Sequence, residues 1–414
     1  MNQKKSRLSQ AMVFLILFGI VSLFSDMTHE GASSIRGAYL ALLGASAGAI
    51  GFISGLGELI GYSMRYLFGR ITDRTRSYWP MVILGYVLDI IAVPALALVG
   101  EHGWIAACLL LVVQRMGKAI KKPAKDTIMS FAASQEGAGR SFGLQELLDQ
   151  IGAFLGPVLL WLVMLGRTDA SPIRTYSLCF AVLAIPGGIT LLLLLYTRSR
   201  FPNPEQFEPE PKEYIPFRMK KSFILYIAGI SLFAFGFIDY SLIVMHISRT
   251  AASLSGAVGL ITEETLPLLY AGAMLIDAVS ALFFGFLYDR IGVRSLIFST
   301  LLSSGFAVFV FSMHSVPALL VGIALWGVGM GAQESILKAA VSSMVPKSSR
   351  ATGYGIFECS FGFFWFLGSW MMGALYDFSI PAMVAVSVAA QLLSIPLYLA
   401  SSRQKIREEQ PLHE

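Results

Sequence analysis

The feature that most constrains this chain is a series of long apolar segments that recurs from one end to the other. About 20 mostly apolar residues are enough for an α-helix to cross a bilayer, and each segment approaches or exceeds that length. The segments fall at about 10–42, 46–68, 79–100, 103–130, 141–165 and 172–197, then at 222–248, 264–288, 296–314, 317–345, 351–376 and 380–401. This pattern predicts an all-α membrane protein with twelve transmembrane helices in two bundles of six.

Composition agrees with a membrane protein and excludes most other classes. Of the 414 residues, 55% are hydrophobic and only 14% are charged, whereas about a quarter are charged in ordinary soluble domains. The net charge of +5 requires no nucleic-acid partner, because cytoplasmic loops of membrane proteins collect Lys and Arg. The cysteines Cys108, Cys179 and Cys359 form no C-x-x-C pair, so we expect no disulfide framework, no zinc site and no cofactor.

A charged stretch rich in proline, at 198–221, divides the apolar segments into two sets. It has no helical pattern and is typical of an extended surface linker. We therefore expect a first six-helix bundle at 1–197, a cytoplasmic linker at 198–221, a second bundle at 222–401 and a cytoplasmic tail at 402–414. Loops on one side carry most of the Lys and Arg, while the other side carries only Arg167, Arg174 and Arg249. This bias predicts that both termini are cytoplasmic.

A short motif follows the second helix of each half. Its residues are Gly69, Asp73 and Arg74 in the first copy, and Gly285, Asp289, Arg290 and Arg294 in the second, 216 residues later. These loops resemble the G-x-L-x-D-R-x-G-x-R loops of the major facilitator superfamily of secondary transporters, although the first copy departs from the pattern at Ile71 and Thr75. The resemblance implies two pseudo-symmetric bundles. Charge pairs in such loops can lock neighbouring helices and break when a gate opens, so we expect these residues to gate the cytoplasmic side.

Three further segments resemble a group of little-characterised bacterial permeases of that family. They are Ser25-Asp26-x-x-x-Glu30, Arg115-x-Gly117-Lys118 and Trp365-Phe-Leu-Gly-Ser369. This resemblance implies alternating access and ion coupling, and it leads us to expect a multi-pass protein of the bacterial cytoplasmic (inner) membrane. It does not name the transported solute.

Ionisable residues at membrane depth are unfavourable and therefore mark candidate functional sites. Arg115 lies 11 residues after Trp104, about 16 Å into the bilayer at 1.5 Å per residue, and Lys118 follows on the same face. Arg115 either binds an anionic substrate or serves as the counter-ion of Glu58. The complete set of predicted substrate-binding residues is Arg115, Lys118, Glu58, Asp26, Glu30, Glu334, Asp239 and Trp365.

The first helix carries Asp26, His29 and Glu30 on one face, because these residues are spaced i, i+3 and i+4. Burial raises the pKa of a carboxyl group toward the working pH, so a buried carboxyl group can carry a proton in each transport cycle. The predicted proton-coupling residues are Asp26, Glu30 and Glu58. Carboxylates and imidazoles can also bind a divalent transition metal. That alternative uses Asp26, His29 and Glu30 together with Asp239 and His246.

The sequence favours a proton-coupled secondary transporter that moves a small organic solute, anionic or zwitterionic, and acts as a monomer in lipid. A divalent-metal exporter is the alternative within transport. An enzyme or a sensor is disfavoured, because the chain has no HExxH, G-x-S-x-G or Walker A motif and no room for a sensory domain. Gly152-x-x-x-Gly156-Pro157 resembles part of an element of the family's antiporters and slightly favours export.

Overall fold

The computed structural model describes residues 9–136, 138–166, 171–203, 206, 219–254, 261–312, 315–345 and 350–409. Within this part of the chain the regular structure is helical, without strands. The first half contains α1 (Gln10–Leu42), α2 (Ala47–Thr75), α3 (Tyr78–Ala95), η1 (Leu96–Leu98), α4 (Trp104–Glu136), α5 (Ala138–Leu165), α6 (Pro172–Val182) and α7 (Ala184–Arg200). The second half contains α8 (Lys221–Gly236), α9 (Tyr240–Leu254), η3 (Glu263–Thr265), α10 (Leu266–Ile291), η4 (Gly292–Arg294), α11 (Ser295–Ser303), α12 (Phe306–Ser312), α13 (Val316–Met344), α14 (Arg350–Phe378) and α15 (Ile380–Glu409).

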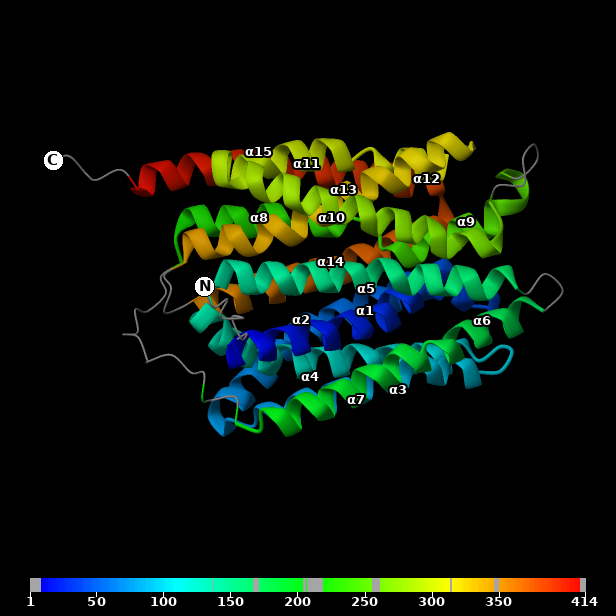
Figure 1. Cartoon of the computed structure of the whole chain (residues 1–414). Coiled ribbons are helices and arrows are strands. Elements are labelled where there is room, and N and C mark those ends of the chain that lie inside the picture. The colour runs from blue at the N-terminus through cyan, green and yellow to red at the C-terminus, as the bar shows by residue number, and fades with distance from the viewer. Residues whose placement is uncertain are drawn as a thin grey trace, which may run out of the picture.

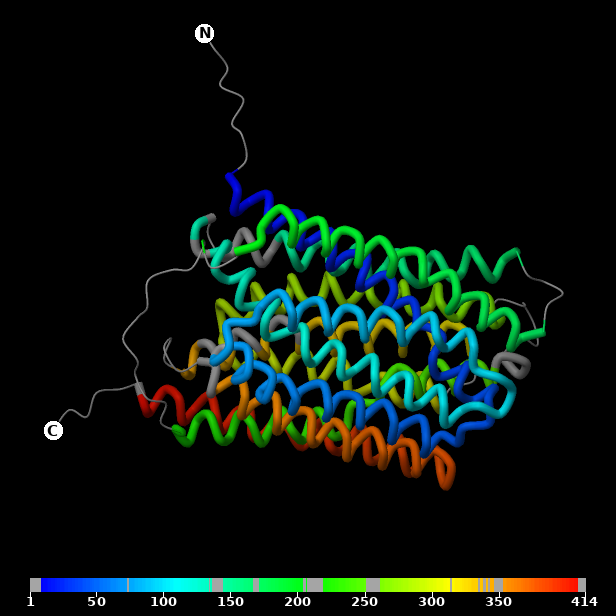
Figure 2. The backbone as a smooth tube through the Cα atoms, turned by 90° about the horizontal axis from the view of Figure 1, so that it is seen from below, coloured from blue at the N-terminus to red at the C-terminus, as the bar shows by residue number. Residues whose placement is uncertain are grey.

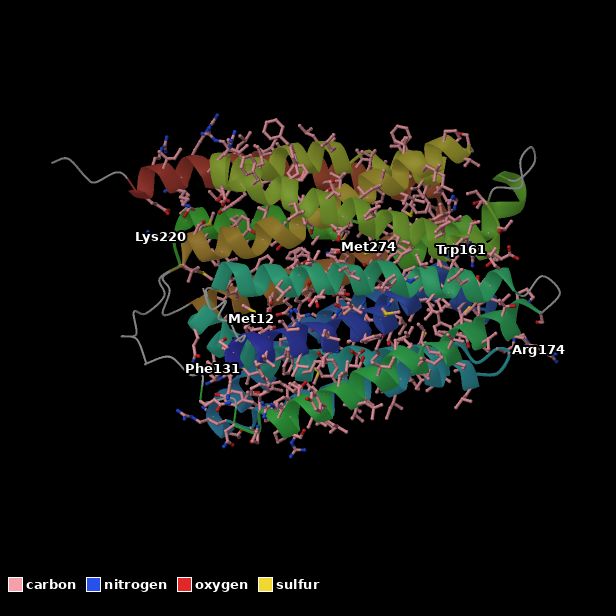
Figure 3. All side chains as sticks on the ribbon, viewed as in Figure 1. Met12, Phe131, Trp161, Arg174, Lys220 and Met274 are labelled. Atoms are coloured by element: carbon pink, nitrogen blue, oxygen red, sulfur yellow. The ribbon has the colours of Figure 1, made fainter. Side chains whose placement is uncertain are left out.

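The helices run side by side in one elongated bundle (Figure 1). Most helices of the first half lie in its lower part and most of the second half in its upper part, with α5 and α14 between them. Helix α1 begins and α15 ends at the same end of the bundle (Figures 1 and 2), which we call the terminal end; the opposite end is the far end. Lys220 lies at the terminal end and Arg174 at the far end (Figure 3), as expected if the terminal end is cytoplasmic.

Several helices are long and apolar enough to cross a membrane. Among the described residues, eight stretches meet that condition. One of them, 263–312, has 50 residues and contains α10, α11 and α12, so it is more than twice as long as one span requires. Helices α2, α4 and α14 are not among the eight, because charged, small and polar residues lower their apolarity. The count of twelve spans stays a prediction.

The predicted helices agree with the observed ones to within a few residues at most ends, but three of them are interrupted. The interruptions fall at Leu183, at 237–239 and at 304–305. The interruption at Leu183 is caused by a proline, because Pro186 has no N–H that could bond to the carbonyl of Val182. The second separates α8 from α9 in the middle of a predicted span.

The break at 237–239 is stabilised by side chains. Backbone groups freed inside a membrane protein need new hydrogen-bond partners. The indole of Trp326 donates to the carbonyl of Ile238 (3.0 Å), and the carboxylate of Asp239 accepts from the backbone N–H of Ser241 (2.8 Å). Asp239 therefore caps α9 and is held at the middle of the bundle.

The two G-x-x-x-D-R motifs lie in helices, which corrects the predicted loops. Residues 69–74 belong to the last turns of α2, and residues 285–290 to the last turns of α10. The helices end only at Arg76 and Gly292, which have positive φ angles of 53° and 61°. Neither motif contains an earlier residue that breaks a helix, so both helices continue through it.

Two glycines bring α5 against α1, as the G-x-x-x-G spacing predicts. A Cβ atom at Gly152 would overlap the carbonyl of Leu23, and one at Gly156 would overlap the carbonyl of Met27. The two helix backbones therefore touch, and α1 is held at a fixed distance from α5.

We expect Gly156→Ala to destabilise the protein, because the added methyl group forces α5 away from α1. Overpacking of this kind lowers the free energy of unfolding by about 1–3 kcal/mol, which thermal unfolding of the purified protein in detergent can measure. The matched control is Gly188→Ala in α7, where a Cβ atom would meet nothing within 4 Å. Equal unfolding midpoints for the two variants would contradict this packing.

Candidate functional site

A cavity of about 380 Å³ lies between the two halves. Helices α1, α2, α3, α4 and α5 line it from the first half, and α9, α10, α13 and α14, with Asp239 just before α9, from the second. Met274, one of the lining residues, lies near the middle of the bundle in Figure 3. Binding sites for small molecules usually have volumes of about 300–1,000 Å³, so the cavity has room for a small solute.

Close backbone contacts shut the cavity at the far end. At Gly37 of α1 and at Gly51 of α2, an added Cβ atom would overlap the backbone carbonyls of Ser241 and Ser369 in the second half. The lining residues instead continue toward the terminal end, as far as Tyr354 in the second turn of α14. The cavity is therefore closed on the far side and faces the terminal end.

Two ion pairs join helices of the first half beside the cavity. Arg115 of α4 lies 2.7 Å from the carboxylate of Glu58 in α2, and both side chains are largely buried (12% and 18% exposed). Lys121 lies 2.5 Å from Asp89 of α3 and 3.9 Å from the centre of the Tyr86 ring. These pairs compensate charges that would be unfavourable alone at this depth.

A third ion pair crosses between the halves at the break in α8–α9. Arg36 of α1 donates to the hydroxyl of Ser241 (2.8 Å) and lies 3.7 Å from the carboxylate of Asp239. Its side chain is 8% exposed. Arg36 thus ties α1 to the capped start of α9, next to the far-end closure.

The imidazole of His29 lies at the centre of a polar cluster. Its Nδ1 is 2.6 Å from the Gln114 amide and its Nε2 is 3.2 Å from the ammonium of Lys118. Glu30 lies 3.7 Å from His29 Nε2 and accepts a hydrogen bond from Tyr270 of α10 (2.5 Å). Both ring nitrogens of His29 therefore already have polar neighbours.

Lys118 and Lys125 differ from the other cations of the cavity. Among the described residues, neither forms an ion pair with a carboxylate; Lys118 contacts His29, and Lys125 donates to Ser22 (2.5 Å). Asp26, which also lines the cavity, makes no hydrogen bond or ion pair within the described part of the chain. The charged neighbours that act on Asp26 are Lys118, Lys125, Asp149 and Glu30.

The wall contributed by the second half has a different chemistry. Besides Asp239, Asp277 and Glu358, it presents aromatic and neutral side chains to the cavity. They include Tyr240, Tyr270, Trp326, Gln333, Phe357, Phe361 and Trp365. The cavity therefore has one wall dense in charges and one that is mainly aromatic.

Most of the predicted substrate-binding residues meet at this cavity. Its lining includes Arg115, Lys118, Glu58, Asp26, Glu30, Asp239 and Trp365. The side chain of Glu334, in α13, lies outside the described part of the structure.

The alternative metal centre is not assembled by this structure. Among the described residues, no group of three His, Cys, Asp or Glu side chains could hold a metal ion. The cation of Lys118 lies against His29, and His246 bonds to the hydroxyl of Tyr376 (2.9 Å), away from the cavity lining. A cation beside the central imidazole would repel a metal ion, so the geometry does not favour this alternative.

The predicted gating residues lie at the terminal ends of α2 and α10. Arg290 lies 4.4 Å from the centre of the Phe286 ring, and Arg294 donates to the hydroxyl of Ser402 (3.2 Å). The side chain of Asp73 lies outside the described part of the structure. The last turns of α2 contain Gly69 and Arg74, and the last turns of α10 contain Gly285 and Asp289. Their gating role stays a prediction.

Sequence reasoning missed several residues of the site, among them Arg36, Lys121 and Gln333. Arg36 could have been recognised as a cation six residues before the end of a 33-residue apolar helix. Lys121 follows Lys118 by about one turn and lies beside other lysines near the end of an apolar segment, so the sequence does not single it out, although it is only 7% exposed and paired. Gln333 carries no charge, and no sequence signal distinguishes it from other polar residues of apolar helices.

Comparison with known proteins agrees with this fold and cavity. The sequence matches the family described as the Major Facilitator Superfamily over residues 8–262 and 246–414. An uncharacterised protein of Mycobacterium tuberculosis is 36% identical over 393 residues, which are 94% of this chain and 92% of that protein. An uncharacterised transporter of the same superfamily type from Methanocaldococcus jannaschii is 26% identical over 373 residues, 88% of either chain. The crystal structure of a nucleoside transporter superposes with a TM-score of 0.71 at 15% identity, covering 95% of this chain and 99% of that one.

The family match and the transporter relative indicate a multi-pass membrane transporter rather than an enzyme. The chain belongs to the Major Facilitator Superfamily. The expectation drawn from the G-x-x-x-D-R motifs is confirmed at the level of the family.

We expect Arg115→Met to destabilise the protein, because it leaves the carboxylate of Glu58 buried and unpaired. Breaking a buried ion pair in this way lowers the free energy of unfolding by about 3–5 kcal/mol. The double variant with Glu58→Gln should recover most of that loss, since both charges are then removed. Thermal unfolding in detergent measures the effect.

Lys122→Met serves as the control for this experiment. Lys122 lies 3.6 Å from Asp126, and their side chains are 36% and 49% exposed. Exposed pairs of this kind contribute about 0–1 kcal/mol. A stable Arg115→Met protein would show that Glu58 does not depend on Arg115.

Proposed function

We propose that this transporter moves a small organic anion together with a proton, by alternating access across a bacterial cytoplasmic membrane. The observation that carries this proposal is the pair of cavity lysines, Lys118 and Lys125, which have no carboxylate partner among the described residues. Both lysines are half-buried, and a cation at this depth is better compensated when a carboxylate or phosphate contacts it directly. The carboxylate or phosphate of a bound substrate would supply that contact.

Asp26 is the proposed carrier of the proton. When Asp26 is ionised, its negative charge partly neutralises Lys118 and Lys125, which act on it electrostatically. When Asp26 is protonated, that negative charge is lost and Lys118 is available to bind an anion, while Lys125 still has the carboxyl group of Asp149 nearby. Proton and anion therefore favour each other's binding, and linkage requires that this coupling be reciprocal. Anion affinity should rise as the pH falls through the range in which Asp26 takes up its proton.

This coupling favours co-transport over exchange. In an exchanger, the proton and the solute must exclude each other from the site, so that each drives the other out. In this site the charges of Asp26 and the lysines make proton binding and anion binding favour each other. The electrostatics thus favour proton-driven uptake, although the Gly152–Pro157 element alone suggests export.

The remaining predicted site residues have supporting roles. Arg115 and Glu58 hold α4 against α2 through their ion pair and so fix the height of Lys118 in the cavity. Glu30 connects α1 to α10 through Tyr270, and Asp239 connects α9 to α1 through Arg36. Because these last two contacts cross between the halves, we infer that they change when access switches from one side to the other.

Alternating access would proceed by rocking of two bundles, residues 1–197 and 222–401, about the cavity. The far-end contacts would break while the terminal ends of α2 and α10 approach their neighbours. The charged residues of the two G-x-x-x-D-R motifs lie at those ends and would stabilise the closed terminal end.

We expect Asp26→Asn to abolish the pH dependence of transport while leaving exchange of the anion intact. Asn cannot carry a proton, yet it has nearly the shape of a protonated Asp and leaves the lysines available. Proteoliposomes with an imposed pH gradient measure net uptake, and counterflow at equal pH measures exchange.

The control is Glu101→Gln, which removes an exposed carboxylate outside the cavity lining and should leave both activities at the wild-type level. Uptake by the Asp26→Asn variant that still follows the pH gradient would show that another group carries the proton.

A further inference from the structure

Among the described residues, the second-half wall contains three polar groups without a hydrogen-bond partner. They are both atoms of the Gln333 amide, the indole N–H of Trp365 and the hydroxyl of Tyr240. The three side chains are only 4%, 7% and 5% exposed, and all of them line the cavity. They come from α13, α14 and the start of α9, so three separate helices contribute them to the cavity wall.

Unsatisfied polar groups in buried positions need an explanation. Each costs about 1–3 kcal/mol, and folded proteins contain few of them. Gln391 of α15, at 0% exposure, shows the usual outcome: its amide donates to the carbonyl of Gly236 (3.3 Å) and to the hydroxyl of Ser387 (3.2 Å). Within the described part of the chain, neither the amide oxygen nor the amide nitrogen of Gln333 forms a hydrogen bond. Its amide is thus available to a molecule in the cavity.

Two of these groups, Tyr240 and Trp365, belong to a series of neighbouring aromatic rings. Ring centres lie 4.5 Å apart for Tyr270 and Tyr240, 5.0 Å for Tyr240 and Trp326, 5.9 Å for Trp326 and Phe237, and 5.8 Å for Phe237 and Trp365. Aromatic pairs at such distances attract one another. A flat ring entering the cavity would extend this series.

We propose that this wall is a subsite for the planar ring of the transported anion, and that Gln333 recognises an edge of the ring that carries adjacent hydrogen-bond donor and acceptor atoms. The anionic end of the same molecule would lie against Lys118 on the opposite wall, which rests on the proposed function above. The substrate class is therefore a planar heterocyclic acid.

The hydrogen-bonding chemistry of the three groups defines which atoms the edge of the ligand ring must carry. An amide side chain offers an acceptor oxygen and donor N–H groups side by side, whereas an indole offers a donor only. The ligand atom near Trp365 is therefore an acceptor, and the atoms near Gln333 are a donor and an acceptor together. A lactam or a ring amide has this arrangement; a benzene or a cyclohexane ring does not.

Four small molecules separate these contributions: orotate, uracil, benzoate and cyclohexanecarboxylate. Orotate has both a lactam edge and a carboxylate, whereas uracil has the lactam edge alone. Benzoate has a carboxylate on a flat ring without a lactam edge, and cyclohexanecarboxylate has a carboxylate on a ring that is not flat. Calorimetric titration of the purified full-length protein measures each affinity. We expect orotate to bind about tenfold or more tightly than benzoate, which corresponds to about one hydrogen bond from a buried group, and benzoate more tightly than cyclohexanecarboxylate.

Gln333→Leu should remove the preference for orotate over benzoate and leave benzoate binding within about twofold of wild type, since benzoate has no edge to pair. The unliganded variant should unfold at the wild-type temperature or above it, because two unpaired polar atoms are lost. The matched control is Gln404→Leu, the same substitution outside the cavity, which should change no affinity. If Gln333→Leu fails to fold, Trp365→Phe keeps the ring, loses the N–H and should weaken orotate alone.

The outcomes separate the subsite from the proposed anion transport. If wild type binds orotate and benzoate equally and Lys118→Met weakens both, the ring-edge subsite is wrong and anion transport stands. If uracil binds as tightly as orotate and depends on Gln333, the subsite stands and the anionic substrate is wrong. If none of the four molecules binds at millimolar concentration, both are wrong.

Discussion

The pairing of charges inside the bundle is the interaction on which the rest of this structure depends. A single charged side chain at the bilayer centre costs about 2.5–3.5 kcal/mol on insertion scales, and the first half contains several of them. Ion pairs such as Arg115 with Glu58 and Lys121 with Asp89 both compensate these charges and hold α2, α3 and α4 together. Lys118 and Lys125 differ from these cations, because among the described residues neither forms an ion pair with a carboxylate.

The helices were largely predictable because apolarity can be read directly along the chain. The first predicted segment, 10–42, coincides with α1, and most other ends agree closely. The break between α8 and α9 was not predictable, since the partners that stabilise it come from distant positions. Trp326 satisfies a carbonyl 88 residues away in sequence, and no local pattern announces that contact.

The site was predictable in its residues but not in its pairings. An ionisable side chain in an apolar segment is visible in sequence, so Asp26, Glu58, Arg115 and Lys118 could be named. Whether a cation meets a carboxylate, as Arg115 does, or a histidine, as Lys118 does, depends on how the helices are rotated and placed. Neutral groups such as the Gln333 amide carry no comparable signal, although they define the other wall.

The far-end closure combines backbone lying against backbone, at Gly37 with Ser241 and at Gly51 with Ser369, with a hydrogen bond from the N–H of Gly48 to the carboxylate of Asp377 (2.9 Å). Attraction between such backbone surfaces has a very short range, and a gap of about 0.5–1 Å already loses a quarter to a half of it. A small separation of the two halves at this end therefore weakens the closure sharply. The hydrogen bond to Asp377 must break as well before a molecule in the cavity can reach the far side.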